Sequence, residues 1–82
     1  MSGVRTEEFR VNGEELLAKI KQLIHEGNIR RIIIKDREGK TLLEFPLTFG
    51  VVGAVLAPTL AAVGAVAALI SEATIVVEKA EN

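Results

Sequence analysis

The sequence predicts a small α+β domain whose elements follow the order β-α-β-β-α-β. Three features support this class: an amphipathic helix with clear start and stop signals, a β-hairpin with a tight turn, and a long uncharged stretch before a final strand. A chain of 82 residues has room for one domain, 1–82, of which we expect 1–5 to be a disordered tail. The order is that of a split βαβ sandwich, so a ferredoxin-like fold with a small antiparallel sheet is the first candidate.

The first two elements are a short strand over 6–11 and a helix over 13–26. Asn12 followed three residues later by Glu15 has the spacing of a capping box, with asparagine in place of the usual serine or threonine. Gly27 supplies a residue that ends a helix in the left-handed conformation. Between these signals the apolar residues recur at helical spacing: Leu16, Leu17, Ile20, Leu23 and Ile24.

A β-hairpin follows the helix. Residues 29–35 are rich in β-branched side chains, 36–39 contain turn residues with Gly39 able to adopt a positive φ, and 40–45 form the return strand. A last strand is expected over 74–79. If alternate residues of these three strands face the helices, three apolar residues face outward and form a candidate patch for a partner sheet: Ile33, Leu42 and Val76. An ordinary sheet surface is the alternative interpretation.

The segment between the hairpin and the last strand has no charged residue from Phe45 to Ser71. Its alanine content predicts a long apolar helix over 48–72, kinked or broken into two at Pro58. On a helical wheel, small residues share one face: Gly50, Ala54, Ala57, Ala61, Gly64 and Ala68. Larger residues share the opposite face: Val52, Leu56, Thr59, Val63, Val66 and Ile70. Small residues let another backbone approach closely and large residues fill a core, so both faces need burial.

One thin sheet covers only one of these two faces, which leads to three hypotheses. The first is self-association through the small-residue face in a homo-oligomer. The second is insertion of 49–70 into a membrane, since the run is long enough to span one. Alanine, glycine and proline contribute little to insertion, however, and no Trp or Tyr marks an interface. The third is a small-ligand or phosphate site at 48–53, where a helix start offers free backbone N–H groups but lacks the lysine of a P-loop.

The composition argues against several classes of function. Ten basic residues balance eleven acidic ones, which gives no electrostatic footprint for nucleic acid. The absence of cysteine fits the reducing cytoplasm. His25 is the only histidine, so it has no histidine or cysteine companion for a metal site, and we expect it on the surface. We therefore expect no catalytic residue, metal or cofactor, and a non-enzymatic protein.

Two clusters of charged residues have structural interpretations. Acidic residues near the first strand and helix are expected at a helix start: Glu7, Glu8, Glu14 and Glu15. Basic residues of the hairpin are interpreted as a solvated sheet edge: Arg30, Arg31, Lys35 and Arg37.

Three segments carry a resemblance to a known family: NIRRIIIKDREGKTLLEFPL, GVVGAVLAP and the closing TIVVE. Over about 7–78 the chain resembles the bacterial and archaeal domain of unknown function 4342. Some members of that family have an added N-terminal module similar to a ubiquitin-associated domain, which has no counterpart in this sequence. The resemblance implies a complete natural domain, and it implies no activity and no catalytic residues.

Overall fold

A computed structural model describes residues 3–46 and 56–81 of the chain. Its elements are β1 (Gly3–Asn12), α1 (Gly13–Glu26), β2 (Ile29–Lys35), β3 (Thr41–Pro46), α2 (Leu56–Ala67) and β4 (Glu72–Glu81). The described elements therefore follow the order predicted from the sequence, and their bounds differ in detail. The first strand begins at Gly3, so residues 3–5, for which we expected a disordered tail, lie in β1 and pair with β4.

The four strands form one antiparallel sheet in the order β1-β4-β2-β3. β1 and β2 consequently run parallel with β4 between them, and β3 and β4 run parallel with β2 between them. This is a split βαβ arrangement, but a ferredoxin-like sheet has its first and third strands in the centre, whereas here the second and fourth are central. The central strands are the ones whose inward residues are fully buried, Ile32 and Ile34 in β2 and Ile75 and Val77 in β4.

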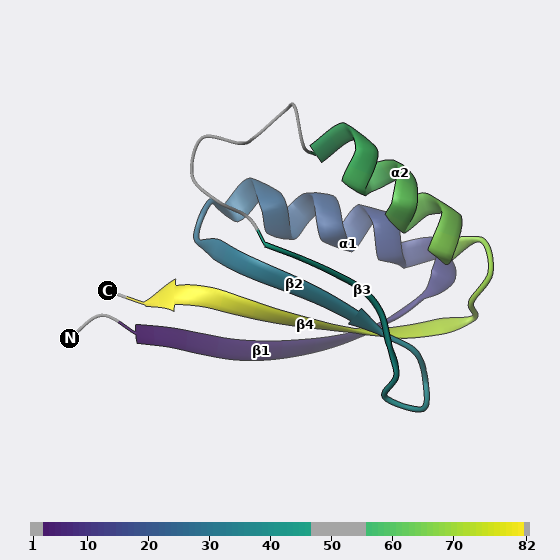
Figure 1. The fold of residues 1–82 in the computed structure, drawn as a ribbon, viewed down its shortest axis with the longest axis horizontal. Helices are drawn as coiled ribbons and strands as arrows, with labels where there is room; N and C mark the ends of the chain where they lie inside the picture. Colours follow the sequence, from purple (N-terminus) through teal and green to yellow (C-terminus); the bar gives the residue numbers. More distant parts are fainter. Residues whose placement is uncertain (1–2, 47–55, 82) are drawn as a thin grey trace.

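Both helices cover the same face of the sheet, and the other face is bare in the described part of the chain (Figure 1). The core lies between the two layers, and its buried residues come from both: Leu16, Ile20, Leu23, Ile29, Ile32, Ile34, Val63, Ala73, Ile75 and Val77. It is almost wholly aliphatic, as the low aromatic content of 4% requires.

The local signals read from the sequence for α1 and the hairpin are confirmed. The Asn12 side chain accepts a hydrogen bond from the Glu15 N–H at 2.8 Å, and the Glu15 carboxylate accepts one from the Asn12 N–H at 3.3 Å. Gly27 ends α1 with a φ of 82°. In the hairpin, the Asp36 carboxylate accepts hydrogen bonds from the Glu38 and Lys40 N–H groups, both at 2.9 Å, and Gly39 has a φ of 85°.

The second helix ends earlier in the chain than predicted, and its predicted start lies outside the described residues. It spans Leu56–Ala67 instead of 48–72, and residues 48–55 lie outside the described part of the chain. Pro58 is its third residue, in the first turn, where the backbone N–H that proline lacks has no partner within a helix. The described helix therefore has Pro58 in its first turn and not at an interior kink, and the part of the predicted helix before Leu56 lies outside the described residues.

The C-terminal end of α2 is set by contacts with the start of α1. The Gly13 N–H donates a hydrogen bond to the Ser71 carbonyl at 3.1 Å, and Glu72 pairs with Asn12 as the first residue of β4. Residues 68–71 therefore form the connection to the sheet instead of a last helical turn. In the described residues, no helix is long and apolar enough to cross a membrane.

Candidate functional site

The helix α2 has one side in the core and one side in solvent. Its inward side places Val63, 0% exposed, in the core and packs half-buried residues around it: Leu60, Val66, Ala67 and Ile70. Val63 and Val66 belong to the face predicted to be large and buried, and in α2 they contact the core; Ile70, predicted on the same face, lies after the end of α2 and is also partly buried against the core. Val52 lies outside the described residues, as do the side chains of Leu56 and Thr59.

The outward side of α2 and of the connection that follows it is formed by Ala61, Gly64, Ala65, Ala68 and Leu69, which we call the outer α2 face. Ala61, Ala65 and Ala68 are exposed, Gly64 is half-buried, and Leu69 is 86% exposed. Ala61, Gly64 and Ala68 are three of the residues predicted to mediate self-association. Of the other three, Gly50 and Ala54 lie outside the described residues, and so does the side chain of Ala57.

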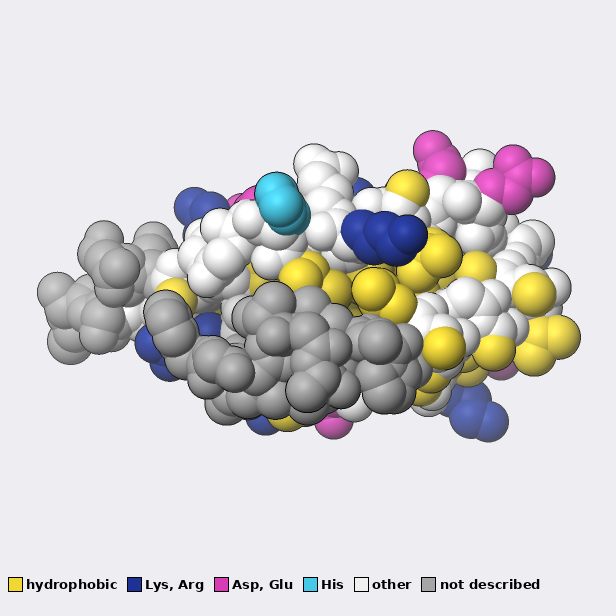
Figure 2. All heavy atoms as spheres, turned by 90° about the horizontal axis from the view of Figure 1, so that it is seen from above, with side chains coloured by type: hydrophobic (Ala, Val, Ile, Leu, Met, Phe, Trp, Pro, Cys, Tyr) yellow, Lys and Arg dark blue, Asp and Glu magenta, His cyan; other side chains and the backbone are white. Residues whose placement is uncertain are grey.

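The outer α2 face carries no charge at all. Surface helices normally present charged or polar residues to solvent, opposite their apolar face. Here no charged residue occurs anywhere from Phe45 to Ser71. Seen from the helix side, hydrophobic side chains gather along the middle of the molecule and toward the C-terminal end of α2, with a basic side chain beside them near the middle and further charged side chains around the outline (Figure 2). Such a surface is typical of a contact with another apolar surface.

Two helical glycines differ in what surrounds them. A Cβ added to Gly13 would collide with the carbonyl oxygen of Ile70 and lie 2.8 Å from that of Ala67, so the close approach of α1 to the end of α2 requires glycine there. A Cβ added to Gly64 would meet no described atom within 4 Å outside the helix backbone. Glycine inside a helix costs about 1 kcal/mol relative to alanine. The described fold therefore gives no packing reason for glycine at position 64.

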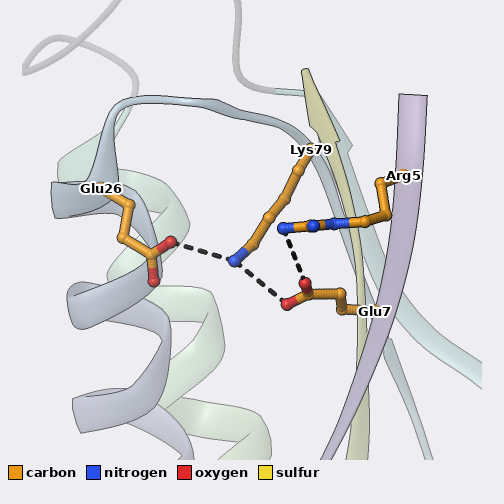
Figure 3. A network of polar contacts seen from close by, with 4 residues as sticks. All are labelled: Arg5, Glu7, Glu26 and Lys79. Atoms are coloured by element: carbon orange, nitrogen blue, oxygen red, sulfur yellow. Dashed lines mark hydrogen bonds and ion pairs between the residues drawn. The ribbon is translucent and has the colours of Figure 1, made fainter. Parts of the chain in front are cut away.

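A second feature of the helix-covered side is a polar network around Lys79. This residue of β4 is only 9% exposed, and its Nζ lies 3.1 Å from Oε1 of Glu7 in β1 and 3.1 Å from Oε1 of Glu26 at the end of α1 (Figure 3). Arg5 also pairs with Glu7, at 3.0 Å. The network joins the last strand to the first strand and to the first helix.

The network shifts the pKa values of two of its residues, Glu7 and Lys79. The hydrogen bond from Lys79 holds the pKa of Glu7 below its usual range, with the charges of Lys79 and Arg5 acting in the same direction. Hydrogen bonds to Glu7 and then Glu26 raise the pKa of Lys79, against the opposing effect of burial. A carboxylate held in its anionic form and paired with a cation is a poor general acid. Glu7 therefore has a structural role in this arrangement.

The paired state of Glu7 predicts a loss of stability in acid. The pKa of Glu7 is lower in the folded protein than in the unfolded chain, so the ionised carboxylate stabilises the fold. This stabilisation is fully present above the unfolded pKa of about 4.3 and is lost as the pH falls through the pKa of the folded protein. We expect Glu7→Gln to remove part of this acid sensitivity. Melting temperatures measured between pH 3 and 7 test it, with Glu8→Gln, an exposed neighbour, as the control. Equal acid sensitivity in the wild type and Glu7→Gln would contradict the assignment.

The remaining residues singled out in the sequence lie apart from these two features. His25 is exposed in the last turn of α1. Ile33 and Val76 are cross-strand partners and, like Leu42, are half-buried outside the core cluster. The expectation of a basic sheet edge needs correction, since β2 is a central strand; its Arg31 pairs with Glu44 on β3 at 3.3 Å. In the described residues, no group of three or more His, Cys, Asp or Glu could hold a metal ion.

Comparison with known families shows where this fold belongs. A family model described as "Domain of unknown function (DUF4342)" matches residues 3–79, which is nearly the whole chain. The chain belongs to the DUF4342 family. Searches of curated proteins and of solved structures found no match. Membership in DUF4342 brings no activity with it, so a functional proposal rests on the surfaces described above.

Sequence reasoning identified the outer α2 face in part and missed the Lys79 network. The sequence does not predict that Leu69 is exposed, because the predicted helix includes this residue and continues to 72. In the structure α2 ends at Ala67, and Leu69 lies in the connection that follows. Strand alternation is the signal that indicates the burial of Lys79. Alternate residues of a strand face the same side, so Lys79 lies on the same side as the buried Ile75 and Val77. Glu7 likewise shares the parity of Phe9, which packs against the core.

Proposed function

We propose that this DUF4342 chain is a non-enzymatic interaction module that self-associates, with the outer α2 face as the contact between copies. The observation that carries the proposal is an uncharged row of small residues, of which Ala61, Ala65 and Ala68 are exposed and Gly64 is half-buried. A second copy is the occupant that this surface fits best, because a flat row of small residues is complementary to itself across a two-fold axis. We place the protein in the reducing cytoplasm, which the absence of cysteine fits. The family resemblance implies that the cell is a bacterium or an archaeon.

The glycine at position 64 supports a close approach between backbones. Small residues at a helix contact let two helices come nearer than large side chains permit. Among the described residues nothing contacts the place of a Cβ at Gly64, so this position leaves room for the close approach of another backbone. A domain of 82 residues also gains from such burial, because a core this small is marginal by itself.

The two alternative functions gain no support from the described residues. A membrane-inserted segment over 49–70 would have to withdraw Val63 from the core, where it is fully buried. The proposed phosphate or small-ligand site at 48–53 lies outside the described residues. Self-association is therefore the proposal that the described surface of α2 supports best.

Single-cysteine variants test the proposed contact, because the sequence contains no other thiol. A disulfide forms only between residues whose Cα atoms come within about 7 Å. We expect Ala61→Cys, Ala65→Cys or Ala68→Cys to give a covalent dimer under mild oxidation at low protein concentration, detected by non-reducing electrophoresis. Ala18→Cys, an exposed alanine on α1, is the matched control and should stay monomeric. Failure of all three α2 variants to exceed the control would contradict the proposed surface.

A further inference from the structure

A depression of about 240 Å³ lies at the hairpin end of the sheet. It is lined by Arg10, Arg37, Glu72, Ala73 and Thr74. These residues come from β1, from the turn between β2 and β3, and from the start of β4, which the sheet topology brings together. None of these residues belongs to the outer α2 face or to the Lys79 network, so the depression is a separate feature of the molecule.

The depression gathers positive charge around one threonine. Thr74 has Arg10 of β1 as its cross-strand partner on one side and Lys35 of β2 on the other. Cross-strand partners point to the same face of a sheet, so these three side chains emerge together. Thr74 follows Ala73 and precedes Ile75, both buried in the core, so the row lies on the face that the helices leave bare.

The charges in this place are only partly paired. In the described part of the chain Arg10 makes no ion pair or side-chain hydrogen bond. Arg37 approaches Glu72 through its Nε, at 3.6 Å, which leaves its two terminal nitrogens available. The lining of the depression contains two arginines, Arg10 and Arg37, and one carboxylate, Glu72, so it carries a net formal charge of +1, and Lys35 lies beside Thr74 in the sheet register.

We propose that this depression binds a small oxyanion of the phosphate class. Arginine guanidinium groups present parallel N–H donors that match the oxygens of phosphate, and the Thr74 hydroxyl adds a further donor. The lining contains no aromatic side chain and Ala73 is its only apolar member, so nothing there would hold a nucleobase. The ligand is therefore the anion itself, dissolved in water, bound through charge and hydrogen bonds.

Removing a positive or a negative charge from the lining should change phosphate affinity in opposite directions, so four proteins test the proposal. Inorganic phosphate is titrated at constant ionic strength into the wild type and into Arg10→Gln, Glu72→Gln and Arg31→Gln, with amide chemical shifts as the readout. The wild type should show saturable shifts centred on Thr74. Arg10→Gln should weaken binding by about tenfold, since a hydrogen bond to a charged group is lost. Glu72→Gln should tighten it, because a repelling carboxylate is removed.

Arg31→Gln is the control for net charge. It removes one positive charge, as Arg10→Gln does, but from β2. In the sheet register Arg31 lies beside Glu78 of β4, and Glu78 is four residues along β4 from Thr74. Unchanged phosphate binding in this variant supports a local site. Equal weakening in Arg31→Gln and Arg10→Gln, or equal shifts with sodium chloride, would overturn the proposal. Binding to phosphatidic acid vesicles without saturable binding of free phosphate would overturn it as well.

Discussion

Replacing Ala61 with lysine is expected to dissociate the assembly while leaving the fold intact. Ala61 is exposed on α2, so the substitution removes no contact that the described chain makes. In a contact between copies, the lysine would place an unpaired ammonium group on an apolar surface, and a two-fold contact would bring two such groups together. A penalty of about 3 kcal/mol weakens association by about 100-fold. Sedimentation velocity over a range of concentrations measures the shift.

The matched control for this variant is Ala18→Lys. Ala18 is also an exposed helical alanine, on α1, where its neighbours Glu14 and Gln22 are exposed polar residues. The substitution changes the net charge by the same amount and leaves the outer α2 face untouched. Wild-type association in Ala18→Lys, together with its loss in Ala61→Lys, places the contact on α2. A similar loss in both variants would show that overall charge, and not this surface, governs association.

Gly13→Ala is expected to destabilise the fold by about 1–3 kcal/mol. The added Cβ would meet the carbonyl oxygens of Ile70 and Ala67, which are backbone atoms and cannot rotate away. The start of α1 would have to move from the end of α2, at the expense of the hydrogen bond from the Gly13 N–H to the Ser71 carbonyl. For a domain of this size, a change of 1 kcal/mol moves the melting temperature by about 4–8 °C.

The control for Gly13→Ala is the same substitution at Gly64. An alanine there meets no described atom outside the helix and relieves the cost of glycine, so the dilute protein should become more stable by up to about 1 kcal/mol. Chemical denaturation at low protein concentration compares the two variants. Equal destabilisation by both would show that glycine content, and not the close approach at Gly13, determines the effect.

How much of this could be predicted from the sequence depends on how local the deciding interaction is. The capping box at Asn12 and Glu15 and the turn at Asp36–Gly39 lie within a few residues of their partners, so the sequence predicts α1 and the hairpin closely. The end of α2 depends on Gly13 meeting Ser71, far away in the chain. Nothing in Ala68–Leu69–Ile70 itself ends a helix, so the prediction extended too far.

The order of strands is a second example of a non-local choice. Alternation along 29–35 and 74–79 shows which residues face the core, and Ile32, Ile34, Ile75 and Val77 are buried as predicted. Alternation does not show which strands are neighbours. β4 is paired with both β1 and β2, which brings Lys79 next to Glu7 and Glu26. The same pairing assembles the Arg10–Thr74–Lys35 row, whose members are far apart in the sequence.

The most direct measurement of the central claim is the mass of the wild-type protein in plain buffer, by sedimentation equilibrium over a wide range of concentrations. The 8.8 kDa chain should be present as an oligomer that dissociates on dilution, because the uncharged side of α2 is then shielded by another copy. A well-folded protein that keeps the mass of a single chain at every concentration would contradict it.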